Sequence, residues 1–195
     1  MARTIASIVS AAGICLALPG TLSAQEPTAD QMAAMMEAVS PDENHAVLEQ
    51  LAGAWSHDVT FYPAPGAEPM QMAATSTAEM TMGGRYLVTE IDGDFLGTPF
   101  EGREVMGYDK VRGQYFALFH DNHSTGPMIS WGAWDPATKT MTMEGTFADP
   151  MTGNLEKQVR NTTQFLDDGS VHYENWGPGP DGEMYKTMEI HSTKQ

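Results

Sequence analysis

Five residues in the middle of this chain combine side-chain types that suit a ligand site: Arg85, Glu90, Tyr115, Asp121 and Trp131. Arg85 follows two glycines, and its planar guanidinium can bind a carboxylate through two parallel hydrogen bonds. An internal salt bridge to Glu90, Asp109 or Asp121 is the simpler interpretation. A ligand carboxylate held by Arg85 is the functional one. Either way, an arginine that points into a core must be paired, because an unpaired buried charge is costly.

General acid–base chemistry could use His45, Glu90 or Asp121, but no spacing between them requires it. The chain has no Gly-x-Ser-x-Gly nucleophile elbow, no Gly-x-Gly-x-x-Gly loop and no Walker loop. We therefore assign no catalytic residues and expect a non-enzymatic protein. The enzymatic alternative is a cofactor-free isomerase or lyase in which Arg85 acts with Glu90 or Asp121.

Two histidine patterns could bind a metal or a haem. The segment His120-Asp121-Asn122-His123 places two imidazoles and a carboxylate close together, and they could bind one divalent cation if the strand end curls. His191 could be an axial haem ligand, but it shares the polar face of its strand with Glu189. A polar loop and an outward strand residue explain both patterns, so we expect no metal and no cofactor.

The chain is rich in methionine, with 15 residues of this type. Eight of them fall on predicted strands: Met80, Met82, Met106, Met128, Met141, Met143, Met184 and Met188. Flexible thioethers suit either a plain core or the wall of a cavity. If a cavity exists, these methionines and the aromatic residues Tyr115, Phe119, Trp131 and Trp134 would suit an apolar or aromatic small molecule.

Polarity alternates with a period of two from Ala54 onward, which is typical of half-buried strands. Turn sequences such as Gly83-Gly84 and Asp168-Gly169 separate the strands. Ten strands are predicted, at 55–62, 72–82, 85–92, 101–109, 113–121, 127–135, 139–148, 155–167, 170–177 and 183–192. Because no helical stretch follows any of them, they must pair antiparallel, and closure into a barrel would remove the free edges. The sequence predicts an all-β fold: an antiparallel up-and-down β-barrel with short N-terminal helices.

Two helices are expected before the strands. Thr28-Ala29-Asp30-Gln31 fits a capping box that opens a helix over 31–39. Ser40-Pro41-Asp42-Glu43 fits a second box, with Ser40 as the N-cap and Pro41 in the first turn. The second helix should end between Leu51 and Gly53.

Residues 1–24 have the features of an export signal. Arg3 provides the positive start, residues 5–18 are apolar, and small residues lead to a cleavage site after Ala24. The apolar run is shorter than the roughly 20 residues that span a bilayer. We expect a periplasmic or extracellular protein with a leader and short helix at 25–40 and one barrel domain at 41–195. Its only cysteine, Cys15, lies in the signal, so disulfides and thiolate zinc sites are excluded from the mature chain.

The charge of the chain is strongly negative, with 26 acidic residues against 10 basic ones and a formal net charge of −16. Such a surface repels phosphate backbones and anionic lipid headgroups. We therefore expect no nucleic-acid partner and no membrane partner, and leave protein partners open.

Several short motifs resemble the DUF1579 family of bacterial proteins, which is defined by sequence alone. They run in the family's order: 48–55 after His45, 82–87, 99–102, 107–109, 149–153, 177–182 and 188–190. The resemblance implies a calycin-type barrel, similar to lipocalins and fatty-acid-binding proteins. Gly53-Ala54-Trp55 is similar to the Gly-x-Trp that opens the first lipocalin strand, which implies that Trp55 is buried at the barrel base. The family offers no catalytic residues to transfer.

Taken together, these observations favour an exported barrel that binds a small hydrophobic or aromatic ligand without catalysis. The alternatives are the isomerase or lyase described above and a structural or interaction domain whose barrel is filled with side chains.

Overall fold

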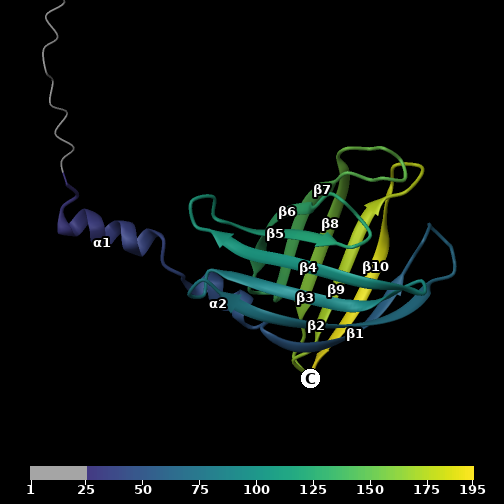
Figure 1. The fold of residues 1–195 in the computed structure, drawn as a ribbon, viewed down its shortest axis with the longest axis horizontal. Helices are drawn as coiled ribbons and strands as arrows, with labels where there is room; N and C mark the ends of the chain where they lie inside the picture. Colours follow the sequence, from purple (N-terminus) through teal and green to yellow (C-terminus); the bar gives the residue numbers. More distant parts are fainter. Residues whose placement is uncertain (1–25) are drawn as a thin grey trace, which may run out of the picture.

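The computed structural model describes residues 26–195, so the predicted export signal lies outside the described residues (Figure 1). Two helices come first, α1 (Ala29–Ala38) and α2 (Glu43–Glu49). Ten strands follow: β1 (Gly53–Phe61), β2 (Met70–Thr81), β3 (Tyr86–Phe95), β4 (Thr98–Asp109), β5 (Gln114–Asp121), β6 (Met128–Asp135), β7 (Thr140–Phe147), β8 (Lys157–Phe165), β9 (Val171–Pro178) and β10 (Met184–Lys194). Each strand pairs antiparallel with the next, and β1 pairs with β10 to close the barrel. The predicted up-and-down barrel is confirmed. None of the helices within residues 26–195 is long and apolar enough to cross a bilayer.

Closure joins the first strand to the last. Trp55 lies opposite Lys194 and Phe61 lies opposite Met188 in the β1–β10 pairing. The strands alternate between inward and outward residues, as the period-two pattern predicts. On β7, for example, Met141 and Met143 are buried while Glu144 is exposed.

The helix caps agree only in part with the sequence prediction. Thr28 caps α1 in a capping box with Gln31, as expected. The predicted N-cap of α2 at Ser40 is wrong, because Asp42 takes that position and accepts a hydrogen bond from the Asn44 N–H at 3.0 Å. The Ser40 hydroxyl instead donates to the Met36 carbonyl at 2.6 Å, at the end of α1.

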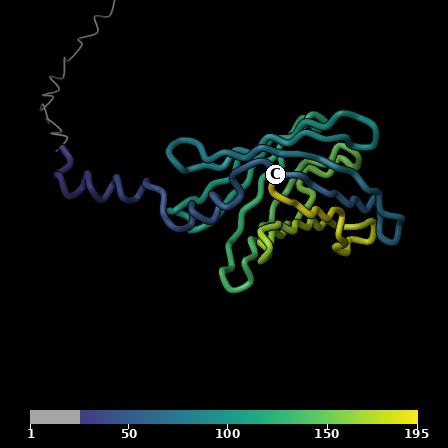
Figure 2. The backbone as a smooth tube through the Cα atoms, turned by 90° about the horizontal axis from the view of Figure 1, so that it is seen from below, coloured from purple at the N-terminus to yellow at the C-terminus, as the bar shows by residue number. Residues whose placement is uncertain are grey.

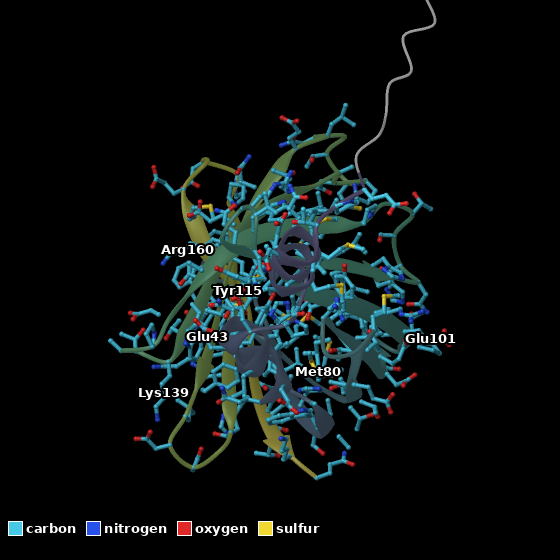
Figure 3. The ribbon with its side chains drawn as sticks, turned by 90° about the vertical axis from the view of Figure 1, so that its left-hand side faces the viewer. Glu43, Met80, Glu101, Tyr115, Lys139 and Arg160 are labelled. Carbon is cyan, nitrogen blue, oxygen red and sulfur yellow. The ribbon has the colours of Figure 1, made fainter. Side chains whose placement is uncertain are left out.

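Helix α2 plugs one end of the barrel (Figure 3). Its Leu48 is completely buried and packs in the main hydrophobic cluster with Leu87 and Met141. The Tyr115 hydroxyl donates to the Asn44 carbonyl at 3.0 Å, and the Trp55 indole donates to the Leu51 carbonyl at 2.8 Å. Apolar packing and hydrogen bonds from β1 and β5 therefore hold the plug in place.

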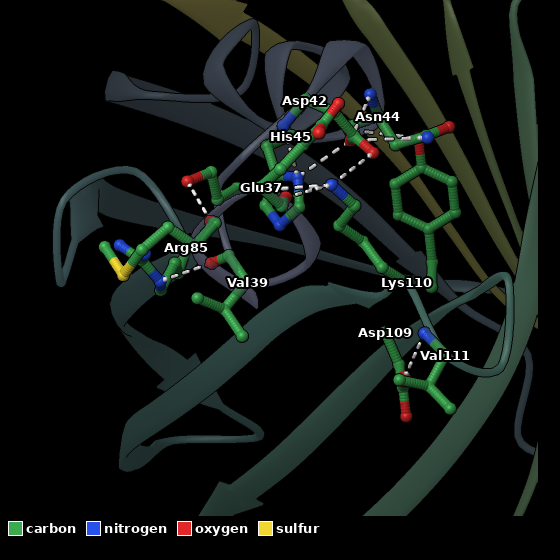
Figure 4. A network of polar contacts seen from close by, with 12 residues as sticks. Glu37, Val39, Asp42, Asn44, His45, Arg85, Asp109, Lys110 and Val111 are labelled. Carbon is green, nitrogen blue, oxygen red and sulfur yellow. Dashed lines mark hydrogen bonds and ion pairs between the residues drawn. The ribbon is translucent and has the colours of Figure 1, made fainter. Parts of the chain in front are cut away.

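The linker before α2 is hydrogen-bonded to two hairpin turns, through Lys110 and through Arg85, which donates to the Val39 carbonyl (Figure 4). Helix α1 extends away from the barrel (Figure 2). Lys110 donates to the carbonyls of Glu37 and Ser40, each at 3.1 Å, and forms an ion pair with Asp42 at 3.6 Å. Helix α1 has no buried residue. The barrel and α2 thus form the packed unit, and α1 projects from it.

Strands β6 and β7 approach each other so closely that two inward positions have no room for a side chain. A Cβ on Gly132 would collide with the carbonyl oxygen of Thr142, and one on Gly145 would collide with the carbonyl oxygen of Ile129. Both obstacles are backbone atoms, which cannot rotate away.

We expect Trp55→Ala to lower the free energy of unfolding by about 3–5 kcal/mol, as for other buried large aromatics. Trp55 is only 5% exposed, and the substitution removes both its packing and its hydrogen bond to Leu51. Urea denaturation measures the loss, with Trp131→Ala on the outer face as the control. A midpoint equal to that of the wild type would contradict the assignment of Trp55 to the barrel base.

We expect Gly132→Ala to destabilise the barrel by about 1–3 kcal/mol or more, the usual cost of overpacking a rigid interior. Gly126→Ala is the matched control, because a Cβ there meets open space. That control should be neutral or slightly stabilising. Equal urea midpoints for the two variants would show that β6 and β7 have room to separate.

Candidate functional site

The barrel encloses a cavity of about 610 Å³ with a mostly apolar lining. At the α2 end the cavity is lined by Leu51 and Trp55. At the other end it is lined by Phe95 and Phe100, and it opens beside the exposed residues Asp94 and His123. Met72, Met106, Met143 and Met188 contribute thioethers to the wall. The structure therefore contradicts the alternative of a barrel filled with side chains.

Aromatic rings surround the open end. The ring centroids of Phe61 and Phe95 are 5.5 Å apart, and His123 lies 5.8 Å from Phe95 and 5.7 Å from Phe100. The His123 Nε2 is 3.1 Å from the Pro99 carbonyl, which turns the imidazole toward these rings. These rings therefore form the rim of the open end.

His57 is the main polar group near the base of the cavity. Its Nδ1 is 2.8 Å from the Ser192 hydroxyl and its Nε2 is 2.8 Å from the Ser76 hydroxyl. Burial lowers the pKa of His57, so the imidazole is neutral and has one donor and one acceptor nitrogen. Both nitrogens are already used by the serines. His57 therefore links β1, β2 and β10 and has no free nitrogen to act as a base.

Glu104 lies midway along β4 and points into the cavity. Its register neighbours are Thr89 on β3 and Phe119 on β5, both of which line the same cavity. Burial raises the pKa of the Glu104 carboxyl to about 7. The carboxyl makes no side-chain hydrogen bond or ion pair with any of residues 26–195. It is half-buried, and it is the one acid of the described lining whose oxygens have no partner.

Tyr173 on β9 is a second polar group in the cavity wall. Burial raises the pKa of its phenol, and the Glu104 charge raises it further. The phenol oxygen accepts a weak hydrogen bond from the Asn175 amide at 3.4 Å, and the same amide donates to Asn161 at 2.6 Å. This arrangement leaves the Tyr173 O–H free to donate into the cavity.

The residues that the sequence singled out are not brought together. Asp121 lines the cavity near its mouth, where its Oδ1 accepts from the His123 N–H at 2.8 Å. Tyr115 points inward but is only 2% exposed, packed beneath α2 and outside the cavity lining. Trp131 lies on the outer face, with the Arg112 guanidinium 4.4 Å from its ring centroid.

Arg85 and Glu90 also lie outside the cavity. Arg85 donates to the carbonyls of Val39 at 3.1 Å and Met82 at 3.0 Å, and it forms no ion pair within residues 26–195 (Figure 4). Glu90 alternates out of phase with the inward residues of β3 and pairs with Arg103 at 3.1 Å on the surface. The expected ion pair between Arg85 and a carboxylate, or a ligand bound by Arg85 within the barrel, is therefore not part of this structure.

The histidines considered as ligands are also separated. His120 is exposed on the outer face of β5, away from Asp121, and His191 is exposed on β10. One group of three possible ligands occurs within residues 26–195, formed by His172, Glu174 and Glu189. The Lys186 ammonium already pairs with both of these glutamates, so a cation has little need to bind there.

Comparison with known proteins agrees with this architecture. A family model described as "Protein of unknown function (DUF1579)" matches residues 40–194. The chain belongs to the DUF1579 family. No protein with a curated description matches it. Among solved structures, this DUF1579 chain is similar to Rv2717c from M. tuberculosis, with a TM-score of 0.60, 11% identity and coverage of 80% of this chain and 99% of the other. At that identity the likeness concerns the fold alone.

The sequence analysis of this DUF1579 protein missed Glu104, His57 and Tyr173. The signal for Glu104 was its phase, since it falls on the same face of its strand as Phe100 and Met106. An acidic residue that alternates in phase with apolar residues along a strand points to the same side as they do, toward the barrel interior. The family motif at 99–102 ends just before it.

We expect Glu104→Gln to change how the stability of this DUF1579 protein depends on pH. The folded state holds the Glu104 proton up to about pH 7, whereas the carboxyl normally releases it near 4.5. Stability from this group is therefore complete below the lower value and is lost as the pH rises through the higher one. Raising the pH from about 5 to about 8 should destabilise the wild type relative to the glutamine variant.

Urea unfolding of both proteins at the two pH values measures this difference. Glu101→Gln, an exposed position on the same strand, is the control and should follow the wild type. If wild type and Glu104→Gln change in parallel, the carboxyl is not desolvated in the folded state.

Proposed function

We propose that this DUF1579 protein is exported and binds a small apolar or aromatic molecule inside its barrel without catalysing a reaction. The observation that carries the proposal is the cavity of about 610 Å³. It falls within the usual range for small-molecule sites, which are mostly apolar with a few polar groups. Residues 1–24 support export, because they have the charge, apolar core and small-residue exit of a cleaved signal.

The polar groups of the cavity favour binding over catalysis. His57 uses both ring nitrogens on serine hydroxyls, and Glu104 and Tyr173 have no base or nucleophile hydrogen-bonded to them. The isomerase or lyase alternative required Arg85 to act with Glu90 or Asp121. That alternative loses its basis because Arg85 and Glu90 lie outside the barrel.

A fluorescent dye tests the proposal. N-phenylnaphthylamine is uncharged at neutral pH and becomes bright in apolar surroundings. We expect it to bind the purified mature protein and to quench Trp55, which lines the cavity. Ile91→Trp places a large ring in the cavity and should weaken dye binding by about tenfold or more.

Asp92→Trp adds the same ring to the adjacent exposed position of β3 and should leave dye binding unchanged. Circular dichroism establishes that both variants are folded. Absence of dye binding to the wild type, or equal loss in both variants, would contradict a ligand site inside the barrel.

A further inference from the structure

Apart from two imidazoles, every side chain that can be charged in the lining of the cavity can become only negative. Glu104 and Asp121 contribute carboxylates to the lining, and His57 and His123 contribute imidazoles. Asp94 lies at the rim on the outward face of β3, where its Oδ1 accepts from the Gly97 N–H. No lysine or arginine is among the described residues that line it. A fatty acid or another organic anion would enter an apolar space that holds two carboxylates and offers no permanent cation. Coulomb repulsion and desolvation both oppose that outcome.

Glu104 has the features of a receiver for a positive charge. It lies midway along the cavity, next to Thr89 and Phe119, and no described protein group donates to it. A buried carboxylate without a partner destabilises the folded protein unless it is protonated or finds a cation. A ligand ammonium at this position would donate hydrogen bonds to an oxygen pair that the protein leaves free.

The surroundings of Glu104 also suit a cation. The ring of Phe119 on the neighbouring strand can attract an ammonium through its π face. The Tyr173 phenol can bind an uncharged polar atom of the same ligand. Outside the cavity, the formal net charge of −16 attracts cations toward the protein and repels anions.

We propose that the barrel of this DUF1579 protein selects apolar molecules that carry an ammonium group, with Glu104 as the residue that receives the charge. The inference rests on the proposed function, because it specifies the ligand class of the same cavity. It assigns to Glu104 a binding role and leaves the apolar part of the ligand to the methionine and phenylalanine walls.

Three compounds with the same alkyl chain test the selectivity: octylamine, octanol and octanoic acid. Each competes with N-phenylnaphthylamine for the wild-type protein at about pH 8, where the amine is protonated, the acid is ionised and Glu104 is charged. We expect octylamine to displace the dye at a concentration about tenfold lower than octanol, and octanoic acid to be the weakest.

Glu104→Gln isolates the contribution of the carboxylate. It should reduce the affinity for octylamine to that for octanol and leave octanol and dye binding unchanged. Glu101→Gln removes one charge from the exposed side of the same strand and controls for the net charge. It should bind octylamine as the wild type does.

A pH series gives a second measurement of the contribution of Glu104. Between about pH 8 and about pH 5, octylamine binding should weaken as Glu104 becomes protonated, while octanol binding should stay constant. His57, Asp121, His123 and Tyr173 also face the cavity, and Asp94 lies at its rim. Glu104→Gln retains all five, so subtracting its pH profile leaves the effect of Glu104.

The outcomes separate the two proposals. If the dye and octanol bind but octylamine has no advantage, or keeps its advantage in Glu104→Gln, the ammonium inference is wrong and the apolar site stands. If octanoic acid binds best, the inference is wrong as well. If neither dye nor octanol binds, both proposals are wrong.

Discussion

The pairing of β1 with β10 is the constraint on which the rest of this structure depends. It joins the first and last strands, so every strand has two neighbours and no edge remains free. His57 reinforces this seam from inside by bridging Ser76 on β2 and Ser192 on β10. Once the sheet is closed, each side chain has only two destinations, the cavity or the solvent. The position of every candidate residue that lies on a strand follows from that choice.

Closure alone would leave the barrel open at both ends, and α2 covers one of them. Leu48 fills the base, and the hydrogen bonds from Tyr115 and Trp55 end on carbonyls of α2 and the turn that follows it. Several apolar side chains belong both to the core cluster and to the cavity lining, among them Leu87, Met106 and Met143. One continuous inner surface thus forms both the core and the wall of the cavity.

The strands could be predicted from the sequence because each leaves a local signal of alternation and turn residues. The sequence did not show whether Ser40 or Asp42 would be the N-cap of α2, because both residue types suit that position. The choice depends on His45, which pairs with Asp42 in the folded chain. The site was harder to predict. Arg85 and Glu90 were conspicuous by type, whereas the side on which a residue points depends on its phase along the strand. Glu104 was in phase with its apolar neighbours and was overlooked.

The plug at the base has a kinetic consequence. If the proposed ligand binds in the cavity, α2 covers the base, and the ligand would leave past the aromatic residues of the open end before a second molecule can enter: Phe61, Phe95, Phe100 and His123. Exchange is then sequential, and its rate is the rate at which the first molecule departs, whatever the concentration of the second. For the ligand proposed above, the aromatic rings at the open end would then govern the residence time, and the interior would govern the affinity.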